Sequence, residues 1–441
     1  MKDIEFSFKD AMVSQQTIFE TAERLRPEIE HLATAISEGY ESDFASLCLP
    51  DDRLMLGKVR QVIEENLKLK PVYLIVDGIG GSNLGTKAVQ EAVLGKLYNQ
   101  LTKATKVLYA DTVDSDSINN IITLVKPVLE KGDNIILNVI SKSGTTTETT
   151  ANAEVLIDFL RRYKKDYKNF VSVASDKDSE LWNIAVKEGF TVLEVPKKVG
   201  GRYSVFSPVG LFPLGLLGID IERLLDGAKC MKAACVDTNI EKNPAAVSAA
   251  IQYLHYMSGK NISDLFLFAN DLESLGKWCR QLVAESLGKE FNRKGETVNV
   301  GITPDVSIGS TDLHSMAQLY LGGPYDKFTV FLSIKNSNSH INVPRLKRYS
   351  KLVNGIQGKS LESIMGAILE GTKGAFRKGK RPFMEAKLRS KSEYALGQFL
   401  QFKMMETIYL GFLLGVNPFN QPNVESYKEE TRRILRKKDA S

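Results

Sequence analysis

The chain has 441 residues, which is more than one hydrophobic core usually supports, so we expect two domains. Its net charge is only +5, with acidic and basic residues interspersed, and this argues against a nucleic-acid partner. The four cysteines are scattered, with no Cys-x-x-Cys pair and no clustered histidine, which argues against a metal site and a disulfide framework. We therefore expect a cytoplasmic protein that binds no metal.

The sequence predicts no membrane segment. Residues 1–6 contain no apolar core of a signal peptide. The most apolar stretch, residues 407–416, is shorter than the roughly 18 residues that a membrane span requires. We expect this stretch to be a buried helix, and no membrane partner.

The first 65 residues have apolar side chains at helical spacing, among them Ile18, Ala22, Leu25 and Ile29. From residue 71 onward, short apolar strands alternate with helices, which predicts a parallel sheet with helices on both faces. Ligands of such sheets bind at the carboxyl ends of the strands. The strands expected in this region span residues 72–76, 107–110, 135–140, 170–174 and 191–195.

A second α/β unit begins near residue 245, after an apolar helix at residues 209–217. Its expected elements are strands at residues 265–268, 328–334 and 381–387 and a long helix at residues 392–415. The predicted fold class is thus α/β, with two parallel sheets that are each flanked by helices. The predicted division of the chain is a helical segment at 1–65, α/β domains at 66–225 and 226–415, and a C-terminal arm at 416–441, whose basic end we expect to be helical.

Residues 141–149 follow the strand expected at residues 135–140 and precede a helix, and six of these nine residues are Ser or Thr. The first N–H groups of a helix have no partner within the helix and attract anions. Ser and Thr hydroxyls donate to phosphate oxygens without bringing charge into the site. An N-cap, the alternative explanation, needs only one hydroxyl, so the segment favours a phosphate site.

A glycine-rich segment, residues 77–85, also lies between a strand and a helix. Its glycines let backbone N–H groups approach a ligand closely. The dinucleotide fingerprint is not met, because Asn83 occupies its third glycine position. The P-loop order is not met either, because Thr86 precedes Lys87. The segment therefore indicates a small phosphorylated ligand.

Glu285 lies in the last turn of a helix that we expect to end at Gly288. A carboxylate there faces the negative end of the helix dipole, which keeps it basic, as a general base requires. The alternative is a surface ion pair with Lys289, four residues further on. Spacing alone does not decide between the two.

Three further residues have both a functional and an ordinary interpretation. His314 lies in a polar turn for which Thr311 or Asp312 is the expected helix N-cap, and such a histidine is more often packed or solvated. Arg202 follows two glycines that permit close approach of a ligand, although an ordinary ion pair is the commoner role. Lys428 lies in a charged run that is typical of a solvated helix face.

Together and in this order, these segments resemble the motif series of the glucose-6-phosphate isomerase family. The resemblance implies two sugar-isomerase type α/β domains, between an N-terminal helical segment and a C-terminal arm. It also implies a homodimer with shared active sites, a hexose 6-phosphate substrate, and no metal or other cofactor. It extends from about residue 71 to 428 and rests on residues 78–85, 141–149, 200–204, 285–289, 310–315 and 419–428.

The resemblance implies a role for each residue that matches a family motif. Glu285 matches the base that moves a proton between C2 and C1 of the open-chain sugar, and Arg202 matches the arginine that stabilises the enediolate. His314, which comes from the neighbouring subunit in the family, and Lys428 match residues that act in ring opening. The positions implied in substrate binding are Gly81, Ser82, Ser141, Lys142, Ser143, Thr146, Gly201 and Gln421.

The reaction implied is the reversible isomerisation of D-glucose 6-phosphate to D-fructose 6-phosphate in glycolysis and gluconeogenesis. The alternatives are a non-catalytic sugar-phosphate sensor of the same fold and an isomerase that also accepts mannose 6-phosphate. Three features depart from the family pattern. Asn423 stands where a small Gly or Ala is usual, and residues 426–427, Ser-Tyr, replace a stretch that often contains Gly. The loop between Lys289 and Ser310 is longer than in compact relatives.

Overall fold

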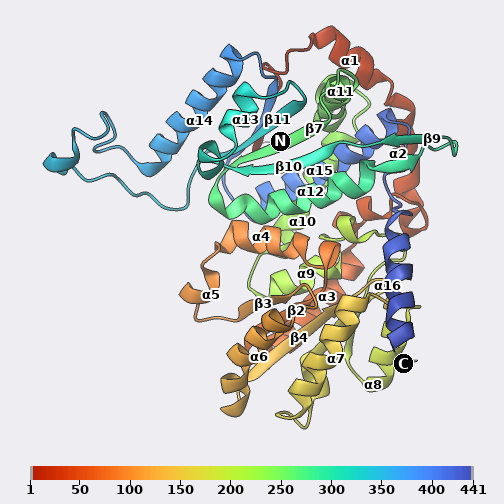
Figure 1. The fold of residues 1–441 in the computed structure, drawn as a ribbon. Coiled ribbons are helices and arrows are strands. Elements are labelled where there is room, and N and C mark those ends of the chain that lie inside the picture. The colour runs from red at the N-terminus through yellow and green to blue at the C-terminus, as the bar shows by residue number, and fades with distance from the viewer. Residues whose placement is uncertain (1–2, 439–441) are drawn as a thin grey trace.

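The structure, a computed structural model, describes residues 3–438 and contains two five-stranded sheets and one two-stranded sheet. Figure 1 shows the two larger sheets in separate halves of the molecule, with helices packed around both. The predicted α/β class, with parallel sheets flanked by helices, is confirmed. The boundaries of the domains stay a prediction.

The first sheet consists of β2 (Pro71–Asp77), β3 (Lys106–Ala110), β4 (Asn134–Ile140), β5 (Val171–Ser175) and β6 (Thr191–Glu194). Its strand order is β3-β2-β4-β5-β6, and all neighbouring strands are parallel. The strands predicted from the apolar runs are confirmed. Because Asp77 at the end of β2 pairs with Val139 of β4, the loops that follow these strands leave the same edge of the sheet side by side.

Helices cover both faces of the first sheet (Figure 1). They form where apolar residues recur at helical spacing, and short turns connect them to the strands. The helices of this half are α3 (Arg53–Lys68), α4 (Leu84–Leu94), α5 (Tyr98–Leu101), α6 (Ser115–Glu130), α7 (Thr147–Arg161), α8 (Glu180–Glu188) and α9 (Pro208–Leu216).

The second sheet consists of β1 (Ile4–Ser7), β7 (Ile262–Phe268), β10 (Thr303–Ile308), β11 (Lys327–Ile334) and β12 (Phe383–Leu388). Its order is β1-β12-β11-β7-β10, and it is parallel except for β1, which runs antiparallel to β12. The sequence predicted β7, β11 and β12 but neither edge strand. β1 has only four residues, too few to show a period of two, and β10 contains Pro304, which an edge strand tolerates.

The remaining elements lie before, around and after the second sheet. β8 (Lys289–Phe291) and β9 (Thr297–Val300) form the two-stranded sheet within the long loop noted in the sequence. The terminal helix predicted from the basic tail is confirmed as α16 (Val424–Lys438). The other helices are α1 (Gln15–Glu23), α2 (Arg26–Ser37), α10 (Ile221–Cys235), α11 (Pro244–Met257), α12 (Glu273–Leu287), α13 (Ala317–Gly322), α14 (Leu361–Lys378) and α15 (Glu393–Leu413).

Helix α15 is buried along almost its whole length and packs against α10, α11 and α12. It includes most of the apolar stretch at residues 407–416, so the prediction of a buried helix there is confirmed. Among residues 3–438, no helix combines the length and the apolar character needed to cross a membrane.

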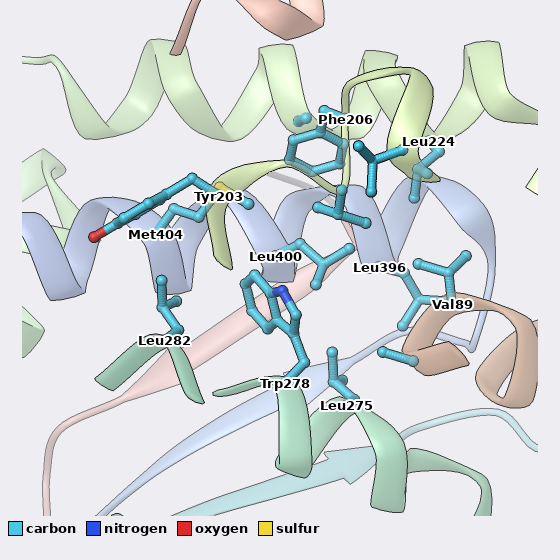
Figure 2. Packing of buried hydrophobic residues seen from close by; sticks show 14 of the residues in the cluster. Val89, Tyr203, Phe206, Leu224, Leu275, Trp278, Leu282, Leu396, Leu400 and Met404 are labelled. Carbon is cyan, nitrogen blue, oxygen red and sulfur yellow. The ribbon is translucent and has the colours of Figure 1, made fainter. Parts of the chain in front are cut away.

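The core joins the two halves of the molecule around Trp278 of α12 (Figure 2). Leu400 of α15 lies next to this indole, and Leu396 of α15, Phe206, which follows the first sheet, and Val89 of α4 belong to the same cluster. All five side chains are buried. Since burial of large apolar side chains is the main favourable contribution to folding, this cluster fixes α12 relative to the loops of the first sheet.

Helices α10 and α15 approach each other closely through two glycines. A Cβ atom at Gly397 would lie 2.0 Å from the carbonyl oxygen of Leu224, and one at Gly227 would lie 2.0 Å from that of Tyr394. Such distances are well below van der Waals contact. The two backbones therefore touch at positions that only glycine permits.

We expect Gly397→Ala to destabilise the protein by about 2–3 kcal/mol, because the added methyl group forces the two helices apart. Gly371→Ala is the matched control, since Gly371 is exposed on α14 and no atom within 4 Å would meet its Cβ. We expect the control to stabilise α14 by about 0.5–1 kcal/mol. Urea denaturation measures both, and equal changes would contradict the packing described.

Candidate active site

The guanidinium of Arg202 lies at the centre of a buried network that joins three parts of the chain. Its side chain is only 1% exposed, and it belongs to the short helix η6 (Gly201–Tyr203). Nε donates to Ser286 Oγ at 2.7 Å, and one terminal nitrogen donates to Gln421 Oε1 at 2.6 Å and to Glu285 Oε2 at 3.3 Å. The other donates to the carbonyl oxygens of Pro418, at 2.6 Å, and Asn420, at 3.2 Å.

Both carboxylate oxygens of Glu285 are held by donors, while part of the side chain remains exposed. Arg202 donates to Oε2, and Gln281 Nε2 donates to Oε1 at 2.9 Å. The side chain is 32% exposed, and it lies in the last turn of α12, as predicted. The carboxylate is thus fixed in orientation and still open to a ligand.

Lys289 does not form the surface ion pair with Glu285 that the sequence left as an alternative. Its ammonium is buried and donates to two backbone carbonyl oxygens, those of Glu285 at 2.6 Å and Asn420 at 2.5 Å. Burial, followed by the charge of Arg202, lowers the pKa of Lys289 to about 8. Lys289 and Arg202 therefore both hold the segment at residues 418–421 against the end of α12.

The glycine-rich loop packs directly on the Arg202 loop. A Cβ atom at Gly81 would lie 2.2 Å from the carbonyl carbon of Gly201, so this contact excludes any side chain. Gly80 has a φ of 59° and lies beside the Gln281 amide, where glycine is the favoured residue. Gly81, Gly201 and the half-buried Ser82 are thereby placed next to Arg202.

The hydroxyl-rich loop follows β4 at the same edge of the sheet, and capping of α7 does not use its hydroxyls. Thr146 occupies the N-cap position, but its side chain makes no capping hydrogen bond and instead lies 3.0 Å from Ser141 Oγ. Ser143 Oγ accepts from the backbone N–H of Thr145 at 3.3 Å. Lys142 is half-buried, and burial lowers its pKa. The loop thus combines hydroxyls with a helix N-terminus, the arrangement expected for an anion site.

His314 lies apart from this network. It is exposed at the end of the short helix η9 (Thr311–His314), and no hydrogen bond or ion pair joins it to Glu285 within residues 3–438. The predicted N-cap was wrong, because Ser310 precedes the helix and no side chain caps it. The carboxylate of Asp312 instead accepts from the backbone N–H of Ile308 at 2.7 Å.

Lys428 also lies outside the network. It is on α16, where its ammonium pairs with Glu425 at 2.8 Å, in line with the solvated-face interpretation. Asn423, at the position that departs from the family pattern, donates to Glu290 Oε2 at 2.7 Å and so ties the start of α16 to β8. The catalytic roles of His314 and Lys428 stay predictions.

Sequence reasoning missed several residues of the network. Gln281 is four residues before Glu285 on α12, so helical spacing alone indicates the contact. Ser286 and the carbonyl oxygens of residues 418 and 420 give no such signal, because only the tertiary fold brings them to Arg202. No group of three or more His, Cys, Asp and Glu side chains suited to a metal lies in the described part of the chain.

A model of the phosphoglucose isomerase family matches residues 66–441. The chain belongs to this family. It is 32% identical to the glucose-6-phosphate isomerase of Carboxydothermus hydrogenoformans, over 92% of this chain and 91% of that protein. The resemblance seen in the motif series is thereby confirmed.

Two solved structures share the fold. A hypothetical protein from Thermus thermophilus matches with a TM-score of 0.85 and 29% identity, over 98% of this chain and 99% of that one. A glucose-6-phosphate isomerase from Chlamydia trachomatis matches with a TM-score of 0.82 over 99% of this chain and 89% of that one. At 19% identity, this second likeness concerns the fold alone.

We expect Arg202→Lys to lower the free energy of unfolding by about 2–4 kcal/mol, because an ammonium cannot reproduce the planar fork of donors. The segment at residues 418–421 should also exchange its amide hydrogens faster, which hydrogen-exchange mass spectrometry measures. The control is Arg293→Lys, since Arg293 is half-exposed and pairs with Glu28 at the surface. A control effect above about 1 kcal/mol, or unchanged exchange in Arg202→Lys, would contradict this role.

Proposed function

We propose that this chain interconverts D-glucose 6-phosphate and D-fructose 6-phosphate, in the cytoplasm, as an enzyme of glycolysis and gluconeogenesis. The observation that carries the proposal is the carboxylate of Glu285, which is fixed by Arg202 and Gln281 and remains partly exposed beside the glycine loop. Family membership and the relatives named glucose-6-phosphate isomerase support it.

The substrate phosphate binds at the edge of the first sheet in this proposal. The hydroxyls of Ser141, Ser143, Thr146 and Ser82 donate to its oxygens, together with the backbone N–H groups of Gly81 and of the first turn of α7. Lys142 lies in the same loop and is half-buried. Binding the ester end far from the reacting carbons positions the sugar and contributes to the rate through orientation.

The reacting carbons lie at Glu285. As a base, the carboxylate takes the proton from C2 of the open-chain aldose and returns it to C1, through an enediolate. Arg202 keeps its charge at every pH of interest, so it stabilises the negative charge that develops nearby. Arg202 also fixes Gln421 by donating a hydrogen bond to its amide oxygen. Gly201 leaves room for the sugar beside this group.

Ring opening needs a group that gives and takes a proton at the sugar ring, a role that imidazoles serve in many enzymes, so we assign it to His314, with Lys428 as a second candidate. Because His314 is exposed in this chain, we assign it to the active site of a second copy in a homodimer. The segment at residues 335–360 extends far from the body between β11 and α14 (Figure 1). Its apolar side chains Ile341, Leu346 and Leu352 are at least half-exposed, and a second copy would cover them.

We expect Glu285→Gln to lower kcat by about a thousandfold or more, because the amide has no basic oxygen for proton transfer. Binding of fructose 6-phosphate, measured by calorimetry, should remain. Glu290→Gln is the matched control, since Glu290 lies five residues further on in β8 and contacts Asn423. Binding without turnover by the wild-type protein would favour the non-catalytic sensor instead, and full activity of Glu285→Gln would remove Glu285 as the base.

We expect a mixture of Glu285→Gln and His314→Ala chains, co-expressed and purified together, to regain activity. In a mixed dimer with shared sites, one of the two sites holds both intact residues. Random pairing makes about half of the dimers mixed, so about a quarter of the wild-type activity should return. Each variant alone should be nearly inactive in the coupled assay. If the mixture remains as inactive as its components, His314 does not act in the site of a partner.

A further inference from the structure

Asp77, the last residue of β2, is fully buried and lacks the partners that a buried carboxylate needs. Within residues 3–438, neither of its carboxyl oxygens has a hydrogen-bond partner. Its polar neighbour is Asn152 on α7, whose amide nitrogen donates instead to the carbonyl oxygen of Thr112 at 3.1 Å. Burial of an unpaired ionised carboxylate is strongly unfavourable, so this environment favours the protonated acid.

Asp77 is placed where the two anion-binding loops of the proposed site begin. The glycine-rich loop starts at the next residue, Gly78, and the pairing partner of Asp77 on β4, Val139, lies two residues before Ser141. Asn152 belongs to the helix that follows the hydroxyl-rich loop. Asp77 therefore contacts the supports of both loops at once.

The helix α7 offers a second buried group without a partner on the same face. Thr149 lies three residues before Asn152, so the two side chains are neighbours along the helix. The Thr149 hydroxyl is buried and has no hydrogen-bond partner among the described residues. A protonated carboxyl carries both a donor and an acceptor and no net charge, so it is easier to bury beside α7 than a carboxylate is.

We propose that Asp77 is a positioning residue that stays a neutral acid, so that it packs at the base of the two phosphate loops without placing a negative charge beneath the phosphate. The proposal rests on the sugar-phosphate function proposed above. Loss of the proton would add a charge of the same sign as the phosphate at the base of both loops. Phosphate binding should then weaken, while proton transfer at Glu285, on another element, should not change directly.

The surroundings of Asp77 set the pH at which this happens. Burial raises the pKa of Asp77 to about 8, and the contact with Asn152 opposes the rise. Its neighbours on the adjacent strands are Ala110 of β3 and Val139 of β4, which do not titrate. The acid is therefore neutral below about pH 8 and becomes charged as the pH rises through that value.

Charged groups on the elements around Asp77 do not account for the shift. Those nearest along the chain are Asp111 after β3, Glu148 in the first turn of α7, and Lys142 in the hydroxyl-rich loop. None of these contributes to the pKa of Asp77, nor does any other charged side chain of the described residues. A phosphate monoester is mostly a dianion above about pH 7, so its own titration does not mask the effect.

The test compares KM and kcat for fructose 6-phosphate from about pH 6.5 to about pH 9.5 in the wild-type protein and in Asp77→Asn. We expect the wild-type KM to rise by about threefold or more above pH 8, whereas that of the variant stays nearly constant. The difference should lie in KM rather than kcat. If the KM of Asp77→Asn follows the wild-type profile, or if only kcat differs, the proposal is overturned.

Asp264→Asn is the matched control, because Asp264 is a buried aspartate of the other sheet, on β7, and burial raises its pKa to about 7. It lies outside the proposed site, so its KM profile should follow that of the wild type. Infrared spectroscopy of Asp264→Asn provides a second readout, which does not need Asp77→Asn to fold. This variant lacks the Asp264 carboxyl, so the band of a buried protonated aspartate can be assigned to Asp77. The carbonyl band of a protonated carboxyl should disappear as the pH rises through about 8. Absence of this band at pH 7 would refute the neutral acid, whereas absence of turnover at pH 7 would refute the proposed function.

Discussion

The buried guanidinium of Arg202 is the interaction on which the arrangement of the site depends. A charge that cannot be neutralised must have its donors satisfied when it is buried. The acceptors come from the end of α12 and from residues 418–421, far apart in the sequence. Folding of the site therefore requires both segments to close on the η6 loop. Arg202 also orients Glu285, so the contacts that stabilise the buried guanidinium also set the position of the proposed base.

The two halves of the molecule contribute different chemistry to this closure. The first sheet supplies loops rich in glycine and hydroxyls at its carboxyl edge, and the second half supplies a carboxylate at the end of a helix. The core around Trp278 holds the two together (Figure 2). Glycine contacts as close as that between Gly81 and Gly201 then leave no room for adjustment between the loops. The distance between the hydroxyl-rich loop and Glu285 is thus fixed by packing rather than by a flexible linker.

Sequence patterns predicted the five strands of the first sheet and β7, β11 and β12 of the second because these are short apolar runs with a turn at each end. The edge strands β1 and β10 of the second sheet were not predicted. They are partly exposed and have only four and six residues, so they carry little periodic signal. In the site, Glu285 and the hydroxyl-rich loop follow from local position. The partners of Arg202 and the backbone contacts of Lys289 do not, because they depend on tertiary contacts across more than 80 residues or on main-chain atoms common to every residue.

Charge is distributed unevenly across the proposed site, and the difference between arginine and aspartate explains why. A guanidinium keeps its charge in proteins, so the burial of Arg202 requires acceptors, and its charge lies beside the proposed base Glu285. An aspartate can gain a proton, and burial raises the pKa of Asp77 to about 8, so burial favours its neutral form. Burial also lowers the pKa of Lys142 in the same region. In the proposed function, the phosphate is therefore bound largely through hydroxyls, backbone N–H groups and a helix N-terminus, whereas the fixed charge of Arg202 lies at the proposed base Glu285.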